Sequence, residues 1–378
     1  MPFCKRKCPY CDFKSIESAR PPEDRFAFCL SKELEKLTGE EGLHKALLRT
    51  IYLGGGTPSI LSPETVAKII GSIKSFLRPA EGLEVTLEAN PDTVGLQKLA
   101  AFRKAGATRL SIGFQALDDR HLVLLGRPHT AEAALDAFRL AREAGFDNVG
   151  VDLMFAIPGQ TLADWEATLK RVSVLRPEHI SLYGLTIEEG TPFHGRYGKG
   201  REGLPSEETE ARMYVMAREV LTGAGYSHYE VSNFSLPGYQ SAHNSRYWKG
   251  GDYLGIGPSA HSYLSRPGWG RRWWNIAGPY EYMERVEKRE SPKEAGEALT
   301  REEAMAEAMM LGLRMVEEGV NGALFAERFG LAPGEAFSGW DELASEGLVT
   351  KRGQDFKLTE KGLLFLNEIL LRLSPKAS

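Results

Sequence analysis

The sequence predicts an α/β protein with a largely parallel sheet, followed by a smaller domain of different composition. Strand-like and helix-like runs alternate about every 30 residues between residues 49 and 183, which is typical of βα units. Polar and glycine-rich residues gather where the strand-like runs end, and βα barrels place their sites at that edge. This periodicity fits a complete barrel, a partial barrel or an open doubly wound sheet equally well.

The elements follow one another in a regular order. Residues 21–37 predict a helix, because Pro22 suits a first turn and apolar residues recur at helical spacing. Cys29 lies beside that apolar stripe, and we expect it to be a small buried hydrophobe. The strands expected next are 49–53, 84–88, 109–115, 148–154 and 179–183, with helices beginning near Ser62, Leu96, Thr130, Thr161 and Ser206. Thr161 and Asp164 are expected to form a capping box. Residues 241–275 are rich in glycine, arginine and aromatic residues but show little periodicity, so we expect loops there.

The composition changes from about residue 300, where a second, smaller domain is expected. Thr300 and Glu303 form a capping box, and a shorter helix is expected near 336–346. A hairpin around Gly353 and a terminal helix over 363–373 complete a winged-helix-like pattern. Its charges form no basic stripe, so we expect it to pack rather than bind nucleic acid. The terminal helix is also a candidate for contact with a membrane surface, although its apolar face is expected to close the domain's core.

The overall composition narrows the class of protein. The chain has 378 residues, which predicts two or three domains, and 42% of them are apolar. A net charge of −4 and a pI near 6.1 argue against a dedicated nucleic-acid binder. No apolar run reaches the roughly 18 residues of a membrane span, and no secretory signal is recognisable. We therefore expect a cytoplasmic protein.

Three of the four cysteines, Cys4, Cys8 and Cys11, fall within eight residues, spaced Cys-x3-Cys-x2-Cys. Thiolates this close are typical of ligands of one metal centre. A zinc site would need a fourth Cys or His nearby, and Cys29 lies well down the chain. A disulfide would leave one thiol over. A [4Fe–4S] cluster normally takes four thiolates, so three would leave one iron open to a small molecule.

These cysteines, with Tyr10 before the last one, resemble the signature of the radical S-adenosylmethionine (SAM) superfamily, in which SAM chelates the open iron. The resemblance continues through most of the chain and is nearest to the group of oxygen-independent coproporphyrinogen III oxidase, especially the HemW-type heme chaperones. It implies a partial (β/α)6 barrel with its [4Fe–4S] cluster over 1–225, a connecting region over 226–298 and a winged-helix-like domain over 299–378. Only Met1-Pro2-Phe3 precedes Cys4. We therefore expect a stunted first strand and a poorly anchored cysteine loop, for which a start upstream of Met1 is one explanation.

A glycine-rich segment, Gly54-Gly55-Gly56-Thr57-Pro58, follows the first expected strand of the repeat. Glycines let the backbone approach a charged ligand closely, although alone they fit a plain turn as well. With the cysteines upstream, the segment resembles the superfamily loop that contacts the amino group of SAM. The resemblance assigns that contact to Gly55, Gly56 and Thr57.

Further SAM contacts of the family map onto polar residues at or after the strand ends. The resemblance implies that Arg127 binds the methionine carboxylate, for which a guanidinium fork is suited. It implies that Glu88 accepts from the amino group and that Gln115 and Asp152 bind ribose or adenine-side groups. Thr186 matches a backbone-contact position. The structural alternative is that these are only polar residues of a solvated barrel rim.

The segment His243-Asn244-Ser245-Arg246-Tyr247-Trp248 resembles the His-Asn-x-x-Tyr-Trp stretch associated with heme binding in HemW-type proteins. An imidazole can bind heme iron, and Tyr and Trp offer flat apolar surface to a porphyrin. The resemblance thus implies heme contacts for His243, Asn244, Tyr247 and Trp248. The run Arg271-Arg272-Trp273-Trp274-Asn275 is a further candidate for the propionates and ring. An aromatic core between domains remains the structural alternative.

Two functions follow from the resemblance. The oxidases carry a further cysteine two positions after the third ligand and a longer N-terminal extension, whereas Asp12-Phe13 follows Cys11 here. These departures favour a chaperone that binds heme and passes it to apo-proteins such as respiratory enzymes. The alternative is an oxidase that converts coproporphyrinogen III to protoporphyrinogen IX by radical oxidative decarboxylation. Both functions imply an electron donor as a partner, and a homodimer is left open.

Overall fold

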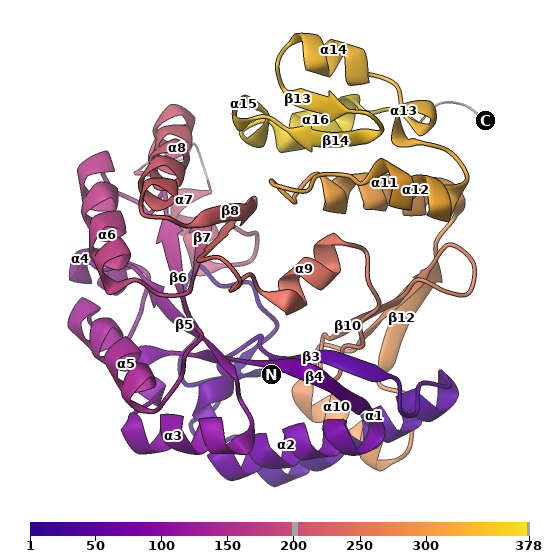
Figure 1. Ribbon diagram of the computed structural model, residues 1–378. Coiled ribbons are helices and arrows are strands. Elements are labelled where there is room, and N and C mark those ends of the chain that lie inside the picture. The colour runs from indigo at the N-terminus through magenta and orange to yellow at the C-terminus, as the bar shows by residue number, and fades with distance from the viewer. Residues whose placement is uncertain (199–202, 376–378) are drawn as a thin grey trace.

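The structure, a computed structural model, describes residues 1–198 and 203–375, and a curled sheet of seven strands is its largest element (Figure 1). Its spatial order is β3 (Leu47–Leu53), β4 (Arg78–Ala89), β5 (Arg109–Gln115), β6 (Val149–Phe155), β7 (His179–Gly184), β9 (Asn233–Ser235) and β8 (Ser227–Glu230). Strands β3 to β7 pair in parallel, and β9 and β8 continue the sheet antiparallel. The sheet is open between β3 and β8, which confirms the partial barrel.

Helices follow the parallel strands and cover the outer face of the curled sheet (Figure 1). The long ones are α1 (Glu23–Glu40), α2 (Pro63–Phe76), α3 (Leu96–Ala105), α5 (Ala131–Glu143), α6 (Leu162–Leu175) and α8 (Glu207–Gly223). Short elements at the strand ends are η1 (Pro58–Ile60), η2 (Pro91–Thr93), α4 (Asp119–Leu124) and α7 (Pro192–Tyr197). The expected capping box of α6 is present: the Asp164 amide donates to Thr161 Oγ1 at 3.1 Å, and the Thr161 amide to Asp164 Oδ2 at 2.9 Å.

Side chains of the strands alternate between two very different faces. Ile51, Val85 and Leu110 join the main hydrophobic core beneath the helices. The residues between them, such as Tyr52 and Ser111, lie on the concave face and hydrogen-bond to carboxylates of neighbouring strands. The hollow of the sheet is therefore polar, whereas its outer face is apolar.

The first strand is short, as expected, but the segment before the cysteine loop is firmly held. Strand β1 (Phe3–Cys4) pairs in parallel with β2 (Ile16–Glu17), outside the large sheet. On its other side, the Gly56 amide donates to Met1 O at 2.6 Å and the Thr57 amide to Phe3 O at 2.8 Å. Phe3 is fully buried. The expectation of a poorly anchored loop is therefore wrong, because the glycine segment supplies a backbone partner that local sequence could not reveal.

The connecting region is more regular than its sequence indicated. It contains α9 (Ala242–Trp248) and a three-stranded antiparallel sheet of β10 (His261–Leu264), β11 (Arg271–Asn275) and β12 (Lys293–Ala298), with α10 (Pro279–Glu287) between β11 and β12. The expectation of loops over 241–275 is wrong. The boundary expected after residue 225 falls between α8 and β8, and β8 and β9 complete the large sheet.

The C-terminal domain has the helices and hairpin of the expected winged-helix-like pattern and its own hydrophobic core. Its elements are α11 (Arg301–Gly312), α12 (Gly322–Phe329), α13 (Pro333–Ala336), α14 (Trp340–Ser345), β13 (Val349–Arg352), β14 (Asp355–Leu358), α15 (Glu360–Leu363) and α16 (Leu366–Arg372). The expected hairpin around Gly353 is confirmed, whereas the expected terminal helix is divided into α15 and α16. Within residues 1–198 and 203–375, no helix is long and apolar enough to cross a bilayer.

Candidate functional site

The three cysteines lie on the loop that leaves β1. Cys4 and Cys8 are buried, Cys11 is partly exposed, and all three thiols are free. Burial raises the pKa of the Cys11 thiol, and the nearby charges of Cys8 and Cys4 raise it further. Among the described residues, no three His, Cys, Asp or Glu side chains converge on a position for a single metal ion. The loop carries three free thiols within eight residues, and thiolates are the ligands that a [4Fe–4S] cluster takes.

Tyr10 lies between the last two cysteines and packs into the barrel. Its ring centroid is 6.1 Å from that of Phe193, and the Phe193 amide donates to Pro9 O at 3.0 Å. Burial raises the pKa of the Tyr10 phenol. The aromatic residue therefore fastens the cysteine loop to α7.

The glycine segment lets two stretches of backbone pass closely. Gly55 has a φ of 109°, which favours glycine, and a Cβ on Gly56 would lie 2.5 Å from Phe3 O. The backbone amides of this segment already have partners. Gly55 N donates to Glu88 Oε2 at 3.1 Å, Gly56 N donates to Met1 O, and Thr57 N donates to Phe3 O. Gly54 O accepts from the Met1 ammonium at 2.7 Å, so the carbonyl oxygens of Gly55 and Gly56 are the backbone groups that could accept from a ligand.

Arg127 lies beyond α4, an element that the sequence analysis missed, and its side chain returns to the strand ends. Its Nη2 donates to Asn90 Oδ1 at 2.6 Å and to Gly113 O at 3.2 Å, and Nη1 donates to Cys8 Sγ at 3.5 Å. Its Nε is buried without a partner. The guanidinium therefore joins the cysteine loop to the sheet and keeps one donor for a ligand such as a carboxylate.

Two carboxylates, Glu88 and Asp152, lie on the concave face near the strand ends. Glu88 accepts from Tyr52 OH at 2.8 Å, and burial raises the pKa of Glu88 to about 7. Asp152 accepts from Ser111 Oγ at 3.0 Å, and burial raises the pKa of this carboxyl too. The charge of Asp152 acts on Glu88 and that of Arg127 acts on Asp152, so these side chains form one electrostatic cluster.

The two remaining residues expected at the strand ends differ in their surroundings. Gln115 ends β5 with a φ of 64°, an uncommon conformation for a residue other than glycine. Such strain is often found at binding sites. Thr186 follows β7 and is exposed, and its side chain makes no hydrogen bond among the described residues. The structure therefore gathers Glu88, Gln115, Arg127 and Asp152 at one end of the barrel and leaves Thr186 at its margin.

The histidine of the expected heme segment lies on α9 and contacts β3. His243 Nδ1 lies 2.8 Å from Thr50 Oγ1, and Nε2 lies 2.8 Å from Tyr247 OH. Its ring stacks on Tyr52, with 4.9 Å between the centroids. Burial and the charge of Arg109 lower the pKa of His243 to about 4, so the imidazole is neutral near pH 7. Both of its ring nitrogens are engaged within the protein.

Trp248 and Asn244 of the same segment have partners other than His243. The guanidinium carbon of Arg314 lies 4.5 Å from the centroid of the Trp248 ring, and Trp248 Nε1 is buried without a partner. The backbone amide of Asn244 donates to Ser241 Oγ at 3.2 Å, and this hydrogen bond caps the N-terminus of α9. The structure thus brings His243 and Tyr247 together and turns Trp248 toward the C-terminal domain.

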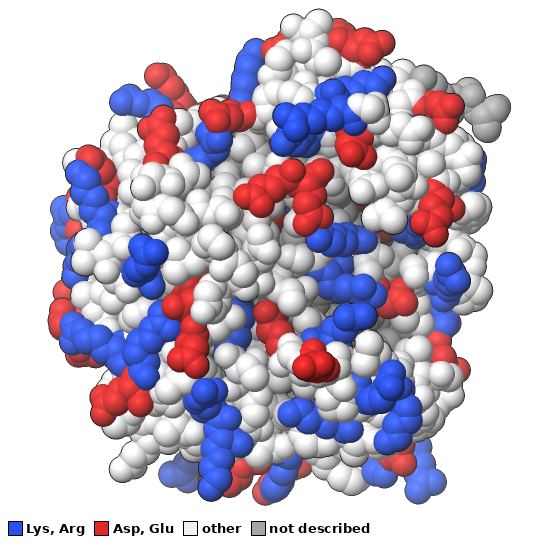
Figure 2. Space-filling view, in the orientation of Figure 1, with Lys and Arg blue, Asp and Glu red and all other residues white. Residues whose placement is uncertain are grey.

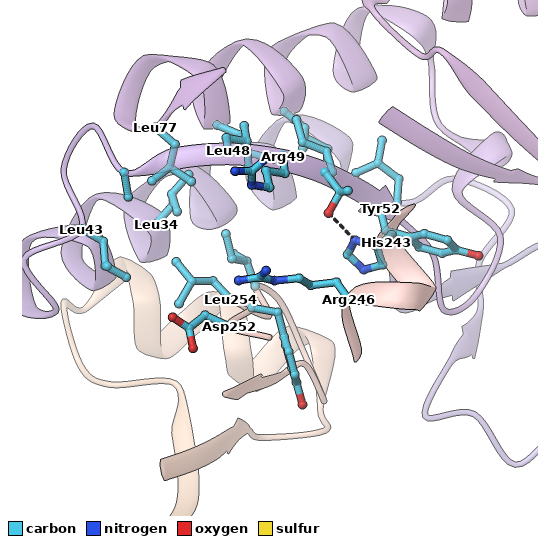
Figure 3. A pocket seen from close by; sticks show the side chains of 18 of the residues that line it. Leu34, Leu43, Leu48, Arg49, Tyr52, Leu77, His243, Arg246, Asp252 and Leu254 are labelled. Atoms are coloured by element: carbon cyan, nitrogen blue, oxygen red, sulfur yellow. Dashed lines mark hydrogen bonds between the residues drawn. The ribbon is translucent and has the colours of Figure 1, made fainter. Parts of the chain in front are cut away.

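A cavity of about 410 Å³ lies beside His243, between the unpaired edge of β3 and the connecting region (Figure 3). Its walls come from α1, β3, α2, α9 and the segment leading to β10, and they are mainly leucine, isoleucine and tyrosine. Ligand pockets usually measure about 300–1,000 Å³ and combine apolar walls with a few polar groups. No sequence pattern predicts this cavity, since its walls come from segments that lie far apart in the chain.

The chain resembles known proteins over almost its full length. Residues 1–172 match the family model of the radical SAM superfamily, and residues 299–365 match that of the HemN C-terminal domain. The heme chaperone HemW of Bacillus subtilis (strain 168) is 36% identical over 371 residues, covering 98% of this chain and 96% of the relative. HemW of Haemophilus influenzae is 34% identical, covering 98% and 95%. The mitochondrial radical S-adenosyl methionine domain-containing protein 1 of Mus musculus is 34% identical, covering 99% and 86%.

A solved structure shares the fold. Coproporphyrinogen III oxidase (HemN) from Escherichia coli superposes with a TM-score of 0.82, covering 98% of this chain and 88% of that one. Its sequence identity is 22%, so the likeness concerns the fold.

Proposed function

Because this chain belongs to the HemW family of the radical SAM superfamily, we propose that it is a heme chaperone, which binds heme and passes it to apo-proteins such as respiratory enzymes. One observation carries the proposal: His243 and Tyr247 meet on the wall of a mainly apolar cavity, with 2.8 Å between Nε2 and the hydroxyl. Imidazole is a ligand of heme iron, and the ring of Tyr247 and the apolar walls suit a porphyrin.

The family implies a [4Fe–4S] cluster and SAM, and the residues present fit both. In this proposal Cys4, Cys8 and Cys11 hold the cluster, which supplies one-electron chemistry when bound. Arg127 already contacts Cys8 and has a buried Nε without a partner, which suits the SAM carboxylate. Glu88 would accept from the SAM amino group.

The protonation of Glu88 follows from its position. Its pKa of about 7 means that the free protein carries a mixture of both forms near neutral pH. A bound ammonium group favours the carboxylate form, since an opposite charge nearby lowers a carboxyl pKa. Gln115 and Asp152 would bind the ribose or adenine side, and Tyr10 and Thr186 would border the ligand.

The oxidase alternative has less support. Where the oxidases carry a further cysteine, this chain has Phe13, which is 57% exposed and adjoins exposed Asp12. The solved oxidase shares the fold at 22% identity, and a fold can host several functions. A recipient apo-protein and an electron donor are the partners that the proposed function requires, and we place it in the cytoplasm.

A heme titration of the anaerobically reconstituted protein tests the proposal. We expect wild type to bind heme and His243→Ala to weaken binding and shift the Soret band, because an iron ligand is lost. The matched control is His261→Ala, which removes an exposed histidine of β10 outside the cavity. Unaltered binding by His243→Ala would contradict the assignment of His243, and no binding by wild type would contradict the proposed function.

A further inference from the structure

Three charged side chains line the cavity, namely Arg49 of β3, Arg246 of α9 and Asp252. Both arginines are exposed, and neither makes a side-chain hydrogen bond or ion pair among the described residues. Asp252 is tied to the connecting region, since its Oδ1 accepts from the Ser265 amide at 2.7 Å. The mainly apolar cavity thus carries two cations without a partner and one carboxylate that a backbone amide holds.

Arg49 and Arg246 line the same cavity from two different elements, β3 and α9. Figure 3 shows the guanidinium groups of Arg49 and Arg246 ending on the same side of the cavity, away from His243. On the face seen in Figure 2, basic side chains also gather in the region that α9 and β10 occupy in Figure 1. A ligand that fits this arrangement is apolar in the middle and carries two acidic groups along one edge.

The arginines that the sequence suggested for such groups are already occupied. Arg271 forms an ion pair with Glu41, the residue that follows α1. Arg272 forms ion pairs with Glu297 and Glu307. A new carboxylate would have to displace these partners, whereas it would meet no competing partner at Arg49 or Arg246.

We propose that Arg49 and Arg246 anchor the two propionates of heme at the rim of this cavity, with the macrocycle against the apolar walls and its iron toward His243 and Tyr247. The inference rests on the proposed function and adds the residues that orient the ligand. Heme carries both propionates on one edge, which matches two guanidinium groups on one side. Guanidinium groups bind carboxylates by paired hydrogen bonds, which are stronger than those between neutral groups.

The experiment compares heme with its dimethyl ester, in which both propionates are neutral. Full-length reconstituted protein is titrated with each ligand as wild type, Arg49→Gln and Arg246→Gln. The control is Arg352→Gln, which removes an exposed, unpaired arginine of the C-terminal hairpin. We expect each cavity variant to bind heme about tenfold more weakly, as loss of a charged hydrogen bond implies. Its affinity for the ester should equal that of wild type, and the control should match wild type for both ligands.

The outcomes separate this inference from the proposed function. The role of the arginines would be overturned if the cavity variants bound heme as well as wild type does, or if they lost affinity for heme and for the ester equally. Heme binding by wild type would still support the proposed function in either case. Retained ester binding shows in the same titration that a variant is folded with its cavity open. If wild type binds neither ligand, the proposed function fails and this inference fails with it.

Discussion

Replacing Tyr247 by phenylalanine should strengthen heme binding if His243 is the iron ligand. In the structure, His243 Nε2 lies 2.8 Å from Tyr247 OH and Nδ1 lies 2.8 Å from Thr50 Oγ1. A nitrogen in a hydrogen bond must leave it before it can bind iron. Tyr247→Phe keeps the ring in the cavity wall and removes only the hydroxyl that competes with iron for Nε2.

The size of the effect follows from that one hydrogen bond. A buried hydrogen bond between neutral groups contributes about 1 kcal/mol net. Its loss destabilises the heme-free form, in which Nε2 is left unsatisfied, but not a form in which Nε2 binds iron. Since 1.4 kcal/mol corresponds to a factor of ten, the heme dissociation constant should fall about fivefold. The free energy of unfolding of the heme-free protein should fall by about 1 kcal/mol.

The assay is a Soret titration with heme, together with denaturant unfolding of the heme-free protein. Tyr253→Phe is the matched control, because Tyr253 also lines the cavity but contacts the ring of Tyr247 rather than His243. Its heme affinity should stay within twofold of wild type. If Tyr247→Phe binds heme more weakly than wild type, the hydroxyl contributes to the bound state and the reasoning is refuted.

Three further predictions concern the cysteine loop, the glycine segment and helix α1. Cys29→Ala should keep the iron content of wild type, because this thiol lies buried beside α10. Cys4→Ala should lose the cluster. Loss of iron in Cys29→Ala alone would contradict the assignment of the cluster ligands. Gly56→Ala should lower the iron bound after reconstitution, since its Cβ would lie 2.5 Å from Phe3 O, and wild-type iron content would contradict this. Glu33 of α1 is buried against the connecting region, where its carboxyl accepts from Tyr282 OH and from the Gly257 amide. Burial raises the pKa of Glu33 from 4.5 to about 7, so its contribution to stability is present below pH 4.5 and is lost as the pH rises to 7. The unfolding free energy of wild type relative to Glu33→Gln should therefore fall by about 3 kcal/mol across that window; a constant difference in denaturant unfolding at pH 4.5, 6 and 7.5 would contradict it.

Much of the fold could be predicted because its signals are local. The βα repeat and the capping boxes at Thr161 and Thr300 depend on residues a few positions apart, and both are confirmed. The small sheet of the connecting region was missed for a physical reason. Strand β12 has the sequence KEAGEA, which lacks the β-branched and aromatic residues typical of strands. It is a strand because it pairs with β11, and pairing cannot be seen in the segment itself.

The candidate site shows the same division between local and distant signals. The cysteine spacing predicts the cofactor loop, and the strand ends predict Glu88 and its neighbours as ligand contacts, because these positions follow from motif and element order. The cavity could not be predicted, since Arg49 and Arg246 lie about 200 residues apart in sequence and meet only across the open edge of the barrel. The sequence offers Arg271 as a partner for a propionate, but Glu41, just after α1, forms an ion pair with it.

The chaperone function is tested most directly by measuring heme transfer and coproporphyrinogen III turnover on the same preparation. Reconstituted protein loaded with one equivalent of heme is mixed with the apo form of a heme-dependent respiratory enzyme, and the spectrum of each protein is recorded after separation. The same preparation is incubated anaerobically with a reductant, SAM and coproporphyrinogen III. We predict that heme moves to the apo-enzyme and that no protoporphyrinogen IX forms. Sustained formation of protoporphyrinogen IX, with heme retained or released without reaching the apo-enzyme, would contradict the chaperone function.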